Sequence, residues 1–164
     1  MKNRFYTIST MIIVVLLAVI FIISLDNNGE NSDSVSTDMT LASLGNVNAM
    51  CRIGESFEKE RYYLQAVSWY EKAADNGSAE AMFKLGRIYM EGHIWDDAGL
   101  AADYFRRSAE CGSKQGQSAY GLCLYYGIGA KEDRESGLYW MKKSASQGDK
   151  MAAGYLHRLD SKDV

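Results

Sequence analysis

Residues 79–92 read AEAMFKLGRIYMEG, and residues 114–127 read KQGQSAYGLCLYYG. Gly86 of the first stretch and Gly121 of the second hold the same place within the motif. A shorter copy, VNAMCRIGESFE, stands at residues 47–58. Self-similarity at a fixed period of about 20–50 residues is typical of repeat architectures, so the repeat decides how the rest of the chain is interpreted.

A second motif follows each copy of the first. It reads AVSWYEKAADNG, AADYFRRSAECG and GLYWMKKSASQG, at residues 66–77, 101–112 and 137–148. Both motifs place apolar residues at i, i+4 and i+7 or i+8, which predicts amphipathic helices. Each second motif ends on a glycine, the residue that favours the left-handed conformation at a helix C-terminus.

The repeating unit is therefore a helix–turn–helix that cannot bury its apolar face alone. Stacked neighbours complete the core of such a protein. The sequence predicts three units followed by a capping helix, at residues 46–77, 78–112, 113–148 and 149–160. Gly86 and Gly121 lie inside helices, where glycine is unfavourable. Their recurrence indicates close approach of a facing Trp or Tyr ring.

The pattern resembles the Sel1-like repeat family, which is related to the tetratricopeptide repeats. The third copy fits best, with Gly127-Ile128-Gly129 followed by Asp133, whereas the second copy lacks the second glycine and keeps Asp97. The first copy lacks this loop. The resemblance covers about residues 44–160. It implies an all-α fold, a short right-handed superhelical α-solenoid, and a non-catalytic scaffold that binds a protein partner without cofactor or metal.

Composition narrows the function classes. The 164-residue chain has a net charge of −3, which argues against a nucleic-acid partner. It contains no phosphate-binding loop and no catalytic motif on which an enzyme could be proposed. His93 beside Asp96 and Asp97 allows a metal site, but an exposed loop is the simpler interpretation.

The N-terminus carries a membrane signature. Residues 5–25 contain no charge, and a helix of that length spans about 31 Å, enough for the hydrocarbon core. Lys2 and Arg4 precede this segment, so the positive-inside rule places residues 1–4 in the cytoplasm and the repeats on the exported side of the cell membrane. A cleaved signal peptide and a secreted product is the alternative. Residues 26–43 are polar and predict a flexible linker.

Export would permit disulfides. The spacing of Cys51, Cys111 and Cys123 nevertheless favours free thiols, with Cys123 as a core residue; a Cys111–Cys123 bridge stays open. The phase of the repeat also predicts a set of core aromatics: Trp69, Tyr70, Tyr89, Tyr104, Phe105, Tyr139 and Trp140.

In related superhelical repeats the first helices line the concave face. Carried over by position, this resemblance implies a partner-binding set of seven residues: Glu55, Phe83, Arg87, Met90, Ser118, Leu122 and Tyr125. The resulting hypothesis is a membrane-anchored adaptor of the cell envelope. Two alternatives are a secreted protein with cell-wall-binding or hydrolase-like activity, and a small immunity or regulatory protein. A homodimer through an uncovered end of the stack is also compatible with the sequence.

Overall fold

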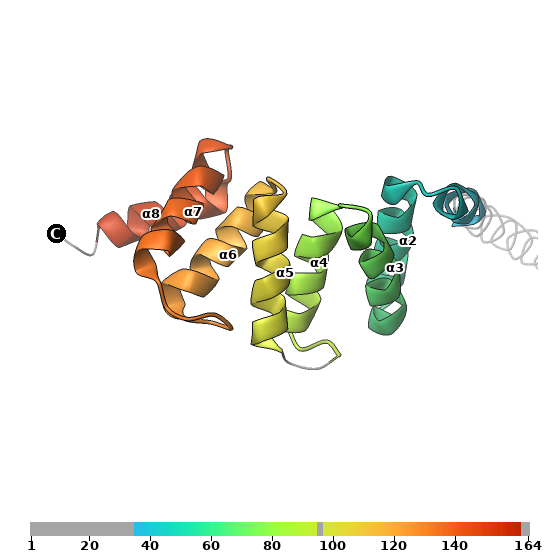
Figure 1. Ribbon diagram of the computed structural model, residues 1–164, viewed down its shortest axis with the longest axis horizontal. Helices are drawn as coiled ribbons and strands as arrows, with labels where there is room; N and C mark the ends of the chain where they lie inside the picture. Colours follow the sequence, from blue (N-terminus) through green and yellow to red (C-terminus); the bar gives the residue numbers. More distant parts are fainter. Residues whose placement is uncertain (1–34, 95–96, 162–164) are drawn as a thin grey trace, which may run out of the picture.

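The computed structural model describes residues 35–94 and 97–161, and within those ranges every regular element is a helix. A helical segment at residues 35–43 comes first. Seven helices follow it: α2 (Val47–Lys59), α3 (Tyr63–Asp75), α4 (Ala79–Met90), α5 (Ala98–Glu110), α6 (Lys114–Tyr126), α7 (Arg134–Ser146) and α8 (Lys150–Asp160). They stand side by side in one row, which is the arrangement of an α-solenoid (Figure 1). The predicted all-α repeat fold is confirmed.

Polar side chains define where most of these helices begin. Ser78, Ser113 and Asp133 each accept a hydrogen bond from the backbone N–H three residues further along the chain. Such caps satisfy a backbone donor that has no partner inside the helix. Asn46, Asp97 and Asp149 cap α2, α5 and α8 in the same way.

Helices pack mainly on their neighbours in the row. The first and second helices of each unit pair as α2–α3, α4–α5 and α6–α7, and successive units join through α3–α4, α5–α6 and α7–α8. The first helices α4 and α6 also contact each other, and they do so more extensively than the second helices contact one another. The first helices α4 and α6 therefore lie on the inner side of the stack.

Three glycines let paired helices approach closely. A Cβ atom added at Gly54 would lie 2.6 Å from the Tyr70 ring, and one added at Gly86 would lie 2.6 Å from the Phe105 ring. At Gly121 the filling side chain is Met141, whose Cγ would lie 2.8 Å away. The predicted packing role of Gly86 and Gly121 is confirmed, but the side chains that fill these spaces are Phe105 and Met141.

The aromatic prediction is therefore only partly right. Tyr70, Tyr89 and Phe105 are buried in the core, as predicted. Trp69, Tyr104 and Trp140 are half-buried at its edge. Tyr139 is 59% exposed, so its assignment to the core is wrong. Its neighbour Met141 points inward instead, because a helix turns about 100° per residue and cannot bury both.

The N-terminal helical segment differs from the expected linker. Residues 35–43 are helical, Ala42 is buried, and Leu41 packs against the core. An ion pair between Asp38 and Arg52 fixes the segment to α2. The flexible linker expected through residue 43 is thus helical over its last nine residues, because Leu41 and Ala42 find an apolar surface.

The predicted membrane segment, residues 5–25, lies outside the described residues. Within the ranges 35–94 and 97–161, no helix combines the length and the apolar character needed to cross a bilayer.

Candidate functional site

The predicted partner-binding residues lie on three consecutive first helices. Glu55 is on α2, Phe83, Arg87 and Met90 are on α4, and Ser118, Leu122 and Tyr125 are on α6. Each is three residues before, one after or four after the shared glycine of its helix. The repeat thus brings them to one side of the stack, although their exposure and contacts differ.

The α2–α4 part of this side is charged. The Nζ of Lys84 lies 3.0 Å from Oε1 of Glu55, and Arg87 forms an ion pair with Glu58. The Tyr70 hydroxyl donates a 2.7 Å hydrogen bond to the other Glu58 oxygen. Burial is the main cause that raises the pKa of Tyr70. These contacts join both helices of the first unit to the first helix of the second.

A shallow depression of about 470 Å³ opens beside this network. The side chains of Glu55 and Arg87 are 44% and 39% exposed there, so both are accessible to a partner. Glu58 also lines the depression and was not among the predicted residues. The repeat alignment could have found it, since Glu58 holds the position of Met90 and Tyr125.

The α4–α6 part is less polar and more buried. Phe83 packs on Phe105 with ring centroids 5.8 Å apart, and Met90 also packs against the core. Ser118 is only 7% exposed, so little of it could touch a partner. Leu122 is half-buried.

Tyr125 gives this part an accessible aromatic surface. Its ring is half-buried and meets the exposed Tyr126 edge-on at a centroid distance of 5.0 Å. The Arg134 guanidinium lies 5.5 Å from the Tyr125 ring centroid. A cation over a ring face is favourable and holds the ring in place.

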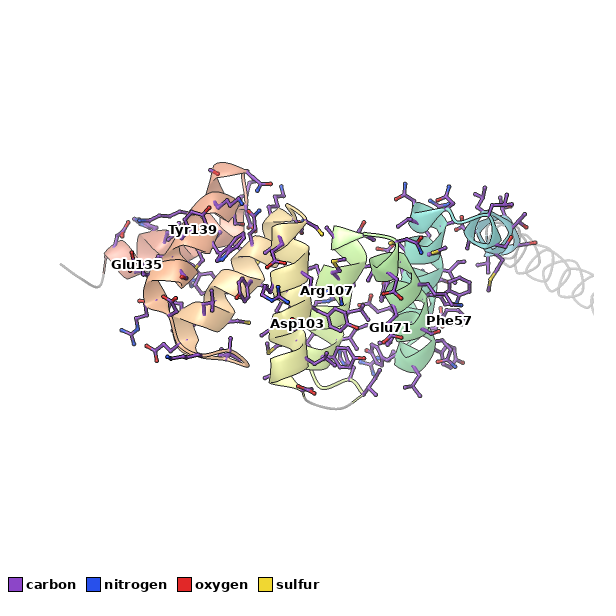
Figure 2. The ribbon with its side chains drawn as sticks, in the orientation of Figure 1. Phe57, Glu71, Asp103, Arg107, Glu135 and Tyr139 are labelled. Atoms are coloured by element: carbon purple, nitrogen blue, oxygen red, sulfur yellow. The ribbon has the colours of Figure 1, made fainter. Side chains whose placement is uncertain are left out.

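The second helices present a different surface. In three units a cation lies over the aromatic residue three positions earlier: Lys72 over Trp69 at 4.0 Å, Arg107 over Tyr104 at 5.3 Å and Lys143 over Trp140 at 4.8 Å. Figure 2 shows Glu71, Asp103 and Arg107 on α3 and α5, and Tyr139 on α7. The second helices therefore carry aromatic and basic side chains similar to those of the first helices, and substitutions there can serve as controls.

All three thiols are free, as predicted. Cys111 is exposed, whereas Cys51 and Cys123 are buried. Burial raises the pKa of Cys123 to about 11, which keeps the thiol protonated and unreactive. Cys123 is therefore a small core residue, in agreement with its prediction.

The loop around His93 is occupied by local contacts. Its Nε2 lies 2.7 Å from a Glu91 carboxylate oxygen, and its ring stacks on Tyr63 at 4.1 Å. Asp97 caps α5 instead of facing His93, and Asp96 lies outside the described residues. Among the residues that the structure describes, no cluster of His, Cys, Asp and Glu is arranged to hold a metal ion.

Comparison with known families agrees with this geometry. The Sel1 repeat model matches residues 47–78, 79–113 and 114–149. The chain belongs to the Sel1 repeat family. The matched boundaries fall within about one residue of those expected from the sequence, since both follow the closing glycines. Sel1 repeats generally form non-catalytic modules that bind proteins.

Two curated relatives are regulatory or binding proteins by name. The chain is 31% identical over 103 residues to chitin synthase regulatory factor 1 of Schizosaccharomyces pombe, a match over 58% of this chain and 23% of the relative. It is 32% identical over 96 residues to DAP3-binding cell death enhancer 1 of Rattus norvegicus, over 58% and 18% respectively. The chain thus spans less than a quarter of the length of either relative.

Solved Sel1-type structures share the fold. A protective antigen of uropathogenic Escherichia coli with an SLR fold superposes with a TM-score of 0.69 at 28% identity, over 72% of this chain and 26% of the antigen. A Sel1 repeat protein from Oxalobacter formigenes gives 0.67 at 26% identity, over 74% and 37%. The cysteine-rich protein B of Helicobacter pylori gives 0.55 at 22% identity, over 72% and 94%, and shows the fold alone.

Proposed function

We propose that this Sel1 repeat chain is an adaptor that binds a protein partner along the inner side formed by α2, α4 and α6. We further propose that residues 5–25 tether it to the cell membrane, with the repeats on the exported side. The uncharged length of residues 5–25 and the preceding Lys2 and Arg4 support the tether and its orientation.

The main support for partner binding is the set of accessible side chains on the inner helices. Arg87 and Glu55 are accessible beside the depression, and Tyr125 offers a positioned aromatic ring on α6. Arginine and tyrosine are over-represented among residues that dominate binding energy. In addition, the buried Nε of Arg87 makes no hydrogen bond among the described residues, so Glu58 does not satisfy the whole guanidinium.

The hydrolase-like or cell-wall-binding alternative depended on a cleaved N-terminus and on paired cysteines. The three free thiols remove that support, so we retain the adaptor. The names of the two curated relatives, a regulatory factor and a binding protein, point in the same direction.

Crosslinking the full chain in its native membrane, followed by affinity capture, tests the proposal. The variant Arg87→Ala/Tyr125→Ala removes both inner anchors and is expected to lower partner recovery at least tenfold. Loss of two anchors worth about 1–2 kcal/mol each has at least that effect. The matched control is Arg107→Ala/Tyr139→Ala, which removes the same residue types from second helices.

Two outcomes separate the parts of the proposal. Equal recovery by wild type and by the inner variant would show that the partner binds elsewhere. Failure of the wild-type chain to capture any protein beyond a mock sample would contradict the adaptor function itself.

A further inference from the structure

The helical segment at residues 35–43 has the closing turn of a second helix. Gly45 has φ +85°, against +85°, +89° and +80° at Gly77, Gly112 and Gly148. The backbone N–H of Gly45 donates to the Ala42 carbonyl at 3.0 Å, and that of Asn46 donates to Leu41 at 3.0 Å. The other three turns repeat both hydrogen bonds at the same spacing. Residues 35–45 are therefore the last part of a second half-repeat that precedes the first full unit.

The opposite end of the stack is a first half-repeat. Asp149 caps α8 as Ser78 caps α4, and Ala152 is buried as Ala81 is. In this register His157 takes the place of Gly86, the glycine that receives a side chain from the paired second helix. The described chain thus begins with a second helix and ends with a first helix.

Among the described residues, nothing covers one face of each end element. Ala152 is the one buried residue of α8, whereas α4 buries six. Met151 is 69% exposed, and Ala153 and His157 are exposed on the same helix. In the complete units the corresponding face of the first helix is covered by its own second helix.

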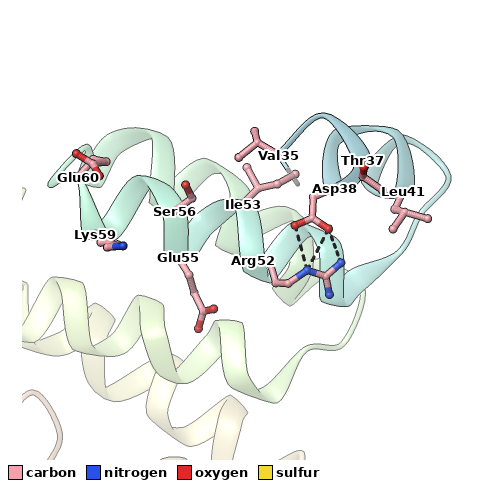
Figure 3. A pocket seen from close by; sticks show the side chains of 10 residues that line it. All are labelled: Val35, Thr37, Asp38, Leu41, Arg52, Ile53, Glu55, Ser56, Lys59 and Glu60. Atoms are coloured by element: carbon pink, nitrogen blue, oxygen red, sulfur yellow. Dashed lines mark hydrogen bonds and ion pairs between the residues drawn. The ribbon is translucent and has the colours of Figure 1, made fainter. Parts of the chain in front are cut away.

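A groove of about 690 Å³ lies at the other end, between residues 35–43 and α2 (Figure 3). Val35, Leu41 and Ile53 give it an apolar lining, and the Asp38–Arg52 ion pair lies at one end (Figure 3). In the middle of the stack, the equivalent space beside a second helix and the next first helix is filled by a first helix, as α4 lies beside α5 and α6. The groove is therefore bordered by a second helix and the next first helix, as a first helix is inside the stack.

We propose that copies of this chain associate head to tail, with α8 of one copy in the groove of the next. The α8 helix and residues 35–43 of the neighbouring copy then complete one composite repeat. Asp38 holds the register position of Tyr70, Phe105 and Met141, which fill the glycine gaps within the complete units. In the composite repeat, Asp38 of one copy faces His157 of the other. An aspartate–histidine pair then stands where a complete unit has a glycine and the side chain that packs on it.

Charge favours this occupant over a symmetric contact between two α8 helices. The α8 helix carries Lys150 and Arg158 against Asp160, a net charge of +1 with His157 neutral. The groove lining has a net charge of −1, from Asp38, Glu55 and Glu60 against Arg52 and Lys59. A symmetric α8–α8 contact would bring together two helices that each have a net positive charge. A head-to-tail contact is heterologous, and it buries two different surfaces that complement each other.

Disulfide trapping of the full-length chain in its native membrane tests the arrangement. The background is Cys111→Ser, which removes the one exposed thiol among the described residues and leaves the two buried ones. Copies with Asp38→Cys and copies with His157→Cys carry different tags and are expressed together. We expect a crosslinked dimer that contains both tags. The control replaces His157→Cys by Lys142→Cys, which is exposed on α7.

The outcomes are distinct. Crosslinks between two His157→Cys copies in preference to the mixed pair would show a symmetric contact and overturn the proposal. Equal trapping of the Lys142→Cys control would also overturn it, as would no trapping combined with unchanged self-association of the variant Ala153→Arg.

A second measurement does not depend on Asp38, whose replacement removes its contact with Arg52. Ala153→Arg places a long cation on the uncovered face of α8, and we expect at least a tenfold weaker self-association by analytical ultracentrifugation in detergent. Ser68→Arg adds the same charge at an exposed site on α3 and should leave association unchanged. If Ala153→Arg associates as well as wild type, the face is not used. The adaptor proposal is independent, because Arg87→Ala/Tyr125→Ala leaves both end surfaces intact.

Discussion

At the scale of single residues, glycine sets how closely paired helices approach. Gly137 on α7 shows this most directly, since an added Cβ would lie 2.7 Å from the Gly121 carbonyl oxygen and 2.8 Å from the Tyr125 nitrogen. Both atoms belong to the α6 backbone, which cannot move without separating the two helices. Gly154 on α8 is a helical glycine in the opposite situation, with no atom within 4 Å of its added Cβ.

These two positions predict opposite effects for the same substitution. Gly137→Ala should lower the free energy of unfolding by about 1–3 kcal/mol, because overpacking outweighs the better helix propensity of alanine. Gly154→Ala should raise it by up to about 1 kcal/mol, since propensity acts there alone. Urea unfolding followed by circular dichroism measures both. Equal stabilisation by the two substitutions would disprove close backbone contact at Gly137.

The sequence predicted these contact positions better than it predicted their partners. The period identified Gly86 and Gly121 as packing sites because glycine recurs in phase. It did not identify Phe105 and Met141 as the filling side chains, since each follows a large aromatic residue, Tyr104 or Trp140, that could also point inward. Which of two adjacent apolar residues points inward depends on the exact rotation of the helix, and the local pattern does not fix it.

At the scale of elements, the sequence located the helices from Val47 to Asp160 and their closing turns. It missed the helix at residues 35–43 because a composition rich in Ser and Thr predicts disorder. The informative feature was short: Leu41 and Ala42 precede Gly45-Asn46 with the spacing that Ala73 and Ala74 have before Gly77-Ser78. The α2–α4 ion pairs were also inaccessible to sequence reasoning, because they join residues from different units.

The Asp38–Arg52 pair gives this element a predictable pH dependence. Its hydrogen bond from Arg52 lowers the pKa of Asp38 below the ordinary 3.8. A lowered carboxyl pKa stabilises the docked segment above the ordinary pKa, and this contribution is lost as the pH falls through the lowered value. Hydrogen exchange of residues 35–43, corrected for intrinsic rates, should therefore show protection that falls below about pH 4.

Two variants isolate this effect. Asp38→Asn and Arg52→Gln should each reduce protection of residues 35–43 at pH 6 and flatten its dependence below pH 4. Asp103→Asn, which removes one of the two exposed acidic partners of Arg106 on α5, serves as the control and should retain the wild-type profile. A wild-type profile in Asp38→Asn would assign the acid sensitivity to another group.

At the scale of the whole molecule, contacts between neighbouring helices build a single row of helices (Figure 1). Stability in such a stack comes from each unit and its immediate neighbours, so function can be placed on surfaces that do not hold the fold together. The exposed parts of the inner side and the two ends are separate surfaces, although Phe83 and the Arg87–Glu58 pair on the inner side also hold helices together. A protein partner and a second copy could consequently be bound at the same time.

The proposed tether and its proposed orientation can be tested with Cys111, which is exposed while Cys51 and Cys123 are buried. With the repeats on the exported side, a membrane-impermeant maleimide should label Cys111 equally in intact and lysed cells, and Cys111→Ser should abolish the label.

Alkaline extraction should leave the chain in the membrane fraction, whereas Leu16→Arg/Val19→Arg should release it, because each charge at the centre of a membrane helix costs about 2.5–3.5 kcal/mol. Labelling that requires lysis would reverse the orientation, and release of the wild-type chain by alkali would contradict the tether.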